Sequence, residues 1–178
     1  DEIVKTANLT FNATSGNWGY FQMKGYNQTF ATINDGGTTG TVIENYESTA
    51  GIAGTSVLTI NGSGVTTFAG AVGDGGQRLN SLTTSGGGTT AINGGSVTTS
   101  LNQSYNEPVT LGIATALTSA NGNIGMTSTL DGGVGRRVAH RHAHAETVQL
   151  GLRQGISALV LDRVLCGQHH ERRLQAVG

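Results

Sequence analysis

Apolar residues in this chain fall in short runs rather than in long helical stripes. Over residues 1–133, Val, Ile, Leu and Ala alternate with Thr and Ser, and short segments rich in Gly, Asn, Asp and Ser separate the runs. This pattern favours strands, and no helical period is visible there. We therefore predict strands within 56–60, 65–70, 79–84, 89–93, 96–99, 108–112, 116–120 and 124–128.

An internal repeat indicates how these strands are arranged. INGSGVTT (60–67) and INGGSVTT (92–99) match at six of eight positions with an offset of 32, and NGNIGMT (121–127) is a weaker copy. Periods of roughly 20 to 50 residues indicate stacked structural units. Asp-Gly-Gly occurs at Asp35, Asp74 and Asp131, between apolar runs, where it suits tight turns. These features predict an all-β parallel solenoid of about five coils, each of roughly 20 to 30 residues. A β-sandwich is the alternative.

The pattern changes near Gly133. Residues 1–133 hold all nine aromatic residues and 24 of the 29 glycines, with eight acids against three bases, a net charge of −5. Residues 134–178 hold all five histidines and the single cysteine, with seven arginines against three acids, a net charge of +4. We therefore divide the chain into a solenoid repeat domain, 1–133, and a basic His/Arg-rich tail, 134–178.

The tail contains an apolar stripe of helical spacing from about Ala145 to Val164. Its members are Val148, Leu152, Ile156, Leu159 and Val160. Because the open end of a solenoid needs a cover, this stripe predicts a C-terminal capping helix. The alternative is an out-of-frame segment, since Arg, His, Ala, Leu, Val and Gln without aromatics are typical of GC-rich DNA read in the wrong frame.

Two stretches carry a resemblance to a known protein class. GAVGDGGQRLNSLTTSGGGTTAINGGSVTTSLNQSYNEPVTLG (70–112) resembles the repeats of large secreted bacterial adhesins of the filamentous haemagglutinin-like and autotransporter passenger type. KGYNQTFATINDGGTTGTVIENYE (24–47) is similar to the autotransporter-associated strand repeat. The resemblance covers about residues 1–133. It implies a right-handed parallel β-helix, secreted or displayed on a bacterial surface, and a fragment of a longer adhesin.

Composition narrows the remaining classes. No stretch reaches the roughly 18 apolar residues of a membrane span, and the N-terminus lacks the basic and apolar regions of a secretory signal. A single cysteine, Cys166, forms no internal disulfide. The arginines of the tail stand without aromatics for base stacking, so they support only weak, salt-sensitive contact and no specific nucleic-acid partner.

Candidate metal ligands lie in both parts of the chain. His140, His142 and His144 alternate, which places three imidazoles on one side of a strand, a donor set suited to zinc. The three Asp-Gly-Gly corners offer carboxylate and carbonyl oxygens to calcium, although they lack the short period of calcium-binding repeats. For the histidines the alternative is fortuitous clustering, and for the aspartates it is turn formation. We expect the chain to need no cofactor, with calcium or zinc as the alternative.

Candidate ligand-binding residues cluster near the N-terminus. Trp18, Tyr20 and Tyr26 offer rings on which a sugar stacks, with core filling as the alternative.

Two functional hypotheses follow. The first is a structural or adhesive fragment that binds a glycan or cell surface and self-associates through its solenoid ends. The second is a small hydrolase acting on a carbohydrate, ester or lactone, with a metal as an option. The sequence favours the first, since it has no G-x-S-x-G motif and residues 1–133 have no His to act as a base.

Overall fold

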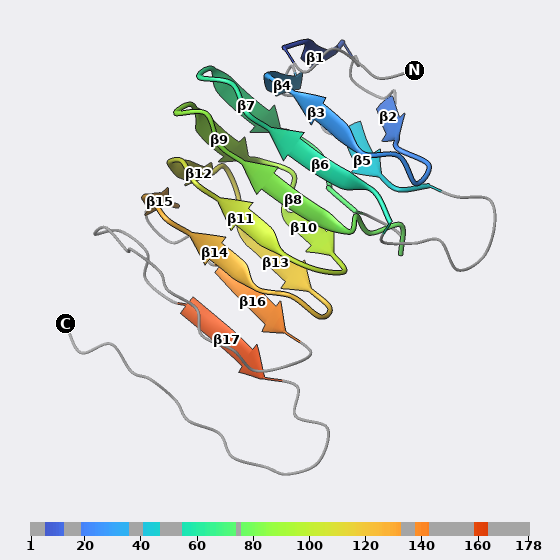
Figure 1. The fold of residues 1–178 in the computed structure, drawn as a ribbon. Helices are drawn as coiled ribbons and strands as arrows, with labels where there is room; N and C mark the ends of the chain where they lie inside the picture. The colour runs from blue at the N-terminus through green and yellow to red at the C-terminus, as the bar shows by residue number, and fades with distance from the viewer. Residues whose placement is uncertain are drawn as a thin grey trace.

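The chain folds as a parallel β-solenoid of about five turns (Figure 1). The computed structural model describes residues 6–12, 19–35, 41–46, 55–73 and 76–132, together with the backbone of 138–142 and 159–163. Every strand pairing among these residues is parallel. The solenoid prediction is therefore confirmed, and the β-sandwich alternative is wrong.

The strands form three faces, and each coil takes one segment from each face. The first face consists of β2 (Gly19–Gln22), β5 (Thr41–Glu44), β10 (Ser96–Thr99), β13 (Thr115–Ser119), β16 (Val138–His142) and β17 (Leu159–Arg163). The second consists of β3 (Gln28–Phe30), β6 (Val57–Ile60), β8 (Ser81–Thr84), β11 (Gln103–Tyr105) and β14 (Ile124–Met126). The third consists of β1 (Asn8–Phe11), β4 (Thr32–Asp35), β7 (Val65–Phe68), β9 (Thr89–Ile92), β12 (Val109–Leu111) and β15 (Leu130–Asp131).

The third coil enters the first face through a single residue. Val72 bridges Ile43 on one side and Val97 on the other. We call the passage from first to second face the first corner, that from second to third the second corner, and that from third to first the third corner. The coils differ in length. Thr90 is in register with Val109, whereas Phe30 is in register with Ile60, which lies further away along the sequence.

The core lies inside the three faces, where alternate residues of each strand point inward. Buried side chains form ladders from coil to coil, because the register stacks like positions. On the second face one ladder joins Phe30 to Ile60, Thr84, Tyr105 and Met126. The prediction that short alternating runs form strands is confirmed, since every predicted stretch overlaps an observed strand.

A polar network crosses the core at the fourth coil. Gln103 is fully buried, and its Nε2 donates to the carbonyl oxygens of Val97 at 3.2 Å and Thr118 at 2.8 Å. The hydroxyl of Tyr105 donates to Oε1 of Gln103 at 3.0 Å. Burial raises the pKa of Tyr105 well above its usual range, so the phenol remains a donor. The amide therefore fastens the second face to the first from within.

The internal repeat marks corners rather than coils. Residues 60–67 span β6 and β7 at the second corner, whereas 92–99 span β9 and β10 at the third corner. The weaker copy, 121–127, leads into β14 at the first corner. The three copies thus occupy three different corners, so the offset between copies is not the coil length.

The predicted capping helix is wrong over Leu159–Arg163. This segment is the strand β17, which pairs with β16, and β16 in turn pairs with β13 of the fifth coil. Pairing of β17 with β16 satisfies backbone N–H and C=O groups that would otherwise remain open at the edge of the sheet. The other residues of the predicted helix lie outside the described part of the chain.

Candidate functional site

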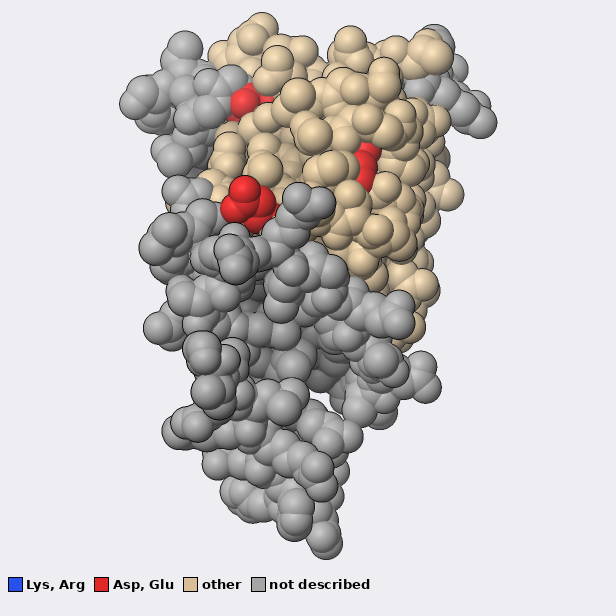
Figure 2. Space-filling model, turned by 90° about the vertical axis from the view of Figure 1, so that its left-hand side faces the viewer, with Lys and Arg blue, Asp and Glu red and all other residues tan. Residues whose placement is uncertain are grey.

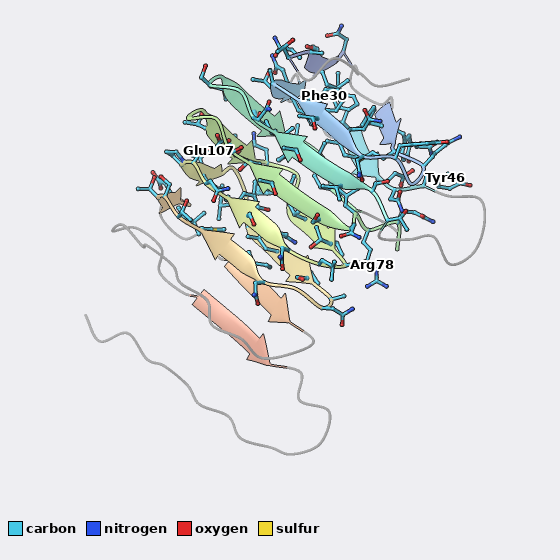
Figure 3. All side chains as sticks on the ribbon, in the orientation of Figure 1. Phe30, Tyr46, Arg78 and Glu107 are labelled. Atoms are coloured by element: carbon cyan, nitrogen blue, oxygen red, sulfur yellow. The ribbon has the colours of Figure 1, made fainter. Side chains whose placement is uncertain are left out.

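The first corner carries two exposed tyrosines. Tyr26 follows β2 and is 72% exposed, and Tyr46 follows β5 and is 41% exposed. Because β2 and β5 are paired in parallel, the tyrosines occupy the same corner of successive coils. Figure 3 shows Tyr46 at the outer edge of the solenoid. Two aromatic rings are thus displayed at the same corner, on neighbouring coils.

Asn45 holds this corner in place. It is fully buried, and its Oδ1 accepts the backbone N–H of Gly25 at 2.7 Å and the hydroxyl of Ser56. Its own backbone N–H donates to the carbonyl of Gln77 at 3.0 Å. One asparagine therefore connects three successive coils next to Tyr46, and the fold fixes the backbone from which that ring projects.

The side-chain oxygens of two exposed asparagines also accept backbone N–H groups of the next coil. Oδ1 of Asn27 accepts the backbone N–H of Val57, and Oδ1 of Asn102 accepts that of Asn123, each at 2.9 Å. Since a backbone N–H only donates, these bonds also fix which side-chain atom is oxygen. The Nδ2 groups of both residues have no acceptor among the described residues, so they remain available as donors to a ligand.

Basic side chains lie on the same side. Lys24 is exposed within the first corner, and Arg78 is half-buried in the corresponding segment of the third coil. Figure 3 places Arg78 on the side of Tyr46 and Glu107 on the opposite side. Glu44 at the end of β5 is buried, and its Oε1 accepts from Nε2 of Gln22 at 3.0 Å. The described side chains of this corner are therefore rich in donors.

The opposite side of the solenoid has a different character. Figure 2 shows separate acidic patches on its described surface and neither Lys nor Arg. Glu107 lies there at the second corner, 2% exposed, where its Oε1 accepts the Thr90 hydroxyl at 2.7 Å. Its Oε2 is buried and has no partner among the described residues. Within the described residues, Thr90 therefore holds Glu107 through one of its two carboxylate oxygens.

Of the three calcium candidates, Asp35 and Asp131 lie in distant coils, and calcium binding stays a prediction. Asp35 ends β4 in the first coil and is buried, Asp131 ends β15 in the fifth coil and is exposed, and Asp74 lies outside the described residues. Four coil spacings separate the first two, roughly 19 Å. No group of three metal-ligating side chains occurs among the described residues.

Burial shapes the chemistry of Asp35. It raises the pKa of this carboxyl above its ordinary value, and hydrogen bonds from the backbone of Ala69 and Gly70 partly offset the shift. Oδ1 of Asp35 has no partner among the described residues. The carboxylate thus acts as a link between two coils.

The aromatic residues near the N-terminus lie in two different environments. Tyr20 projects from β2 and is 55% exposed, whereas Phe21 and Phe30 pack into the core with ring centroids 5.5 Å apart in an edge-to-face arrangement. Trp18 lies outside the described residues. Ligand binding by Trp18, Tyr20 and Tyr26 stays a prediction, and the exposure of the two tyrosines is compatible with it.

The histidine prediction falls on β16. Residues 138–142 form a strand, in which His140 pairs with Leu117 and His142 with Ser119. The structure describes β16 by its backbone alone, and His144 lies outside the described residues. Zinc binding stays a prediction.

Comparison with protein-family models, curated proteins and solved structures finds no match to this chain. The solenoid of about five turns is compatible with a repetitive β-helix adhesin, and the resemblance rests on this fold and on the repeats. Among the described residues there is no helix long and apolar enough to cross a membrane.

Sequence reasoning missed three residues of the first corner: Tyr46, Asn45 and Asn102. The sequence does hold a signal for the first two. Tyr26 is followed by Asn27, and Tyr46 is preceded by Asn45, so the same two residue types occur together twice. Such a pairing gains meaning only once both stretches are known to follow strands of the same face. Asn102 has no comparable signal, because isolated asparagines are common in this chain.

Proposed function

We propose that this chain is an adhesive β-solenoid module of a secreted bacterial surface protein, and that its first corner binds glycan. The observation that carries the proposal is the pair Tyr26 and Tyr46, exposed at the same corner of successive coils. Tyrosine offers a broad apolar ring with a polar tip, which suits the apolar face and hydroxyl edge of a sugar. The adhesin-type repeats and the solenoid of about five turns support the same assignment.

Rigidity supports a binding role at this corner. Asn45 and the backbone hydrogen bonds hold the main chain next to Tyr26 and Tyr46 before a ligand arrives. A preorganised surface loses less conformational entropy on binding than a flexible loop does. The corner therefore suits repeated, modest contacts along a polymer, as adhesion requires.

Affinity electrophoresis tests the proposal. The full chain is run in native gels containing cellulose derivatives, soluble chitin, xylan or dextran, beside the Tyr26→Ala/Tyr46→Ala double variant. We expect at least one polysaccharide to retard the parent chain. The double variant should lose roughly thirtyfold in affinity, because each of the two rings contributes about 1 kcal/mol.

A matched control separates ring stacking from general surface change. Val65→Ala removes an exposed apolar side chain, 62% exposed, from the third face. It should migrate like the parent chain in every gel. Equal retardation of the parent and the double variant, or no retardation of the parent by any polysaccharide, would contradict glycan binding at the first corner.

A further inference from the structure

Each copy of the internal repeat contains an Asn-Gly pair, and the chain contains no other. The pairs are Asn61-Gly62 at the second corner, Asn93-Gly94 at the third corner and Asn121-Gly122 at the first corner. All three asparagines are exposed, and all three glycines are half-buried. By sequence and by exposure to water, the three pairs are therefore alike.

Asn-Gly is a pair in which asparagine readily loses its amide. The backbone nitrogen of the glycine attacks Cγ of the asparagine, because glycine has no Cβ to hinder the approach. The new N–Cγ bond closes a succinimide ring while the Cγ–Nδ2 bond breaks. Nδ2 takes up the proton that the glycine nitrogen gives up and leaves as ammonia. Water then opens the ring to aspartate or isoaspartate.

The fold holds two of the attacking nitrogens with backbone hydrogen bonds. The N–H of Gly62 donates to the carbonyl of Ala31 at 2.9 Å, and that of Gly94 donates to the carbonyl of Phe68 at 3.0 Å. Both acceptors belong to the preceding coil. A nitrogen bonded in this way keeps its proton and its orientation until the two coils separate locally. Attack at these two pairs therefore requires opening of the solenoid.

The following coil packs against the same two pairs. A Cβ added to Gly86 would overlap the carbonyl oxygen of Asn61, and a Cβ added to Gly112 would overlap Oδ1 of Asn93. Each of these glycines thus lets its coil lie directly on the asparagine of the coil before it. The backbone of Asn61 and the side chain of Asn93 are therefore held from both sides.

The third pair, Asn121-Gly122, is held by a side chain instead. The N–H of Gly122 donates to the hydroxyl of Ser119 at 2.9 Å, and this hydroxyl donates to the carbonyl of Leu101 at 2.9 Å. A hydroxyl acceptor moves away when its side chain changes rotamer, without separation of two coils. The nitrogen of Gly122 is therefore released more easily than the nitrogens of the other two pairs.

We infer that Asn121 is a site of spontaneous deamidation in the folded protein, and that the hydroxyl of Ser119 limits its rate. Asn61 and Asn93 are protected by the stacking of the coils and keep their amides. The modification needs only water as a co-reactant. It is independent of the proposed glycan binding.

Deamidation changes the first corner of the fifth coil in two ways. Either product adds a negative charge, and isoaspartate also adds one atom to the backbone between Asn121 and Asn123. The N–H groups of these two residues bond the fourth coil, at the carbonyl of Ser100 (2.8 Å) and at Oδ1 of Asn102 (2.9 Å). A longer backbone no longer matches both acceptors. Formation of isoaspartate therefore loosens the fifth coil.

Ageing of the full chain at mildly alkaline pH tests the inference. Samples are digested, and mass spectrometry follows each asparagine, since deamidation replaces an amide NH₂ with OH. In buffer, Asn121 should convert at least about tenfold faster than Asn61 and Asn93, because separating two coils breaks more hydrogen bonds than rotating one side chain. In concentrated urea the three should convert at similar rates. Equal rates in buffer, or an unchanged Asn121, would overturn the inference.

Ser119→Ala isolates the contribution of the hydroxyl. The variant removes the acceptor of the Gly122 N–H, so Asn121 should convert about three- to tenfold faster than in the parent chain. The other two asparagines report on general loosening of the fold, and their rates should stay as in the parent. The control Ser104→Ala changes a half-buried serine of β11 and should leave all three rates unchanged. Acceleration of all three sites alike, or of none, in Ser119→Ala would refute the role of this hydroxyl.

Discussion

Asp35 illustrates how a single polar residue serves the solenoid interior. Its carboxylate lies at the third corner, where the backbone N–H groups of Ala69 and Gly70 reach it from the next coil. One oxygen remains without a partner among the described residues. Joining two coils with a carboxylate therefore carries a cost, because a buried charged oxygen loses its hydration.

Replacing Asp35 with Asn should stabilise the protein at neutral pH. Burial raises the folded-state pKa of Asp35 above its unfolded value, so the native state binds the extra proton. Stability is then greatest below the unfolded pKa and falls as pH rises through the folded pKa. Asparagine keeps an acceptor for Ala69 and Gly70 but carries no charge, so we expect a gain of about 1 kcal/mol at pH 7.

Urea unfolding at pH 3 to 8 checks this prediction. The difference between Asp35→Asn and the parent chain should be near zero at the acid end and grow toward neutral pH. A control, Asp131→Asn, removes an exposed carboxylate from the same face and so matches the change in net charge without removing a buried group. A parent chain that becomes more stable relative to Asp35→Asn as pH rises would contradict the sign of the argument.

At the scale of elements, the sequence predicts the faces better than the corners. The alternation in stretches such as 96–99 places Val97 inward as expected. β11 was not predicted, because Gln103 and Ser104 look like loop residues. Gln103 is buried because carbonyl groups of the first face accept its amide. Hydrogen bonds to the first face determine the burial of Gln103, and no local sequence pattern encodes these bonds.

The same limit explains the candidate site. Tyr26 could be chosen from its sequence, since it belongs to an aromatic cluster, but the cluster also contains Phe30, which is buried. Which rings face outward depends on strand register. Tyr46 joins Tyr26 only because β2 and β5 are neighbouring strands of one face. The lengths of the coils vary, so the internal repeat did not reveal this pairing.

Glycines at the third corner set how closely coils approach. A Cβ added to Gly94 would overlap the carbonyl oxygen of Gly70 in the previous coil, whereas a Cβ on Gly125 in β14 meets nothing within 4 Å. Gly94→Ala should therefore destabilise the protein by about 3 kcal/mol, since backbone must move to make room. Gly125→Ala should be neutral or stabilising by about 0.5 kcal/mol.

Thermal and urea unfolding of both variants measure the difference. The pair is matched, because each change adds one methyl group to a glycine whose φ is not positive. Equal stability of Gly94→Ala and Gly125→Ala would show that the coils at the third corner are not in close contact. The adjacent Gly95 has a φ of 79°, so it is unsuitable as a control.

On the scale of the whole molecule, stability comes from stacking each coil on its neighbours. The buried ladders run through the five coils, as the row from Phe30 to Met126 on the second face shows. In such architectures stability is close to a sum of coil and interface contributions. β16 and β17 extend the first face beyond the fifth coil, whereas the described part of the second face ends at β14.

Removing residues 134–178 should therefore leave the solenoid folded but with the edge of β13 uncovered. A chain of residues 1–133 keeps all five coils and should retain the β-type circular dichroism spectrum of the parent. Its melting temperature should fall by a few degrees, because β13 loses its pairing with β16. The uncovered edge should also promote association, visible as a concentration-dependent mass in light scattering.

Adding a chelator to both chains is the parallel control. If the tail binds a zinc ion, the chelator removes it and lowers the melting temperature of the full chain but not that of the truncated chain. Loss of the β spectrum on truncation would contradict independent folding of the five coils and make the tail an integral part of the solenoid.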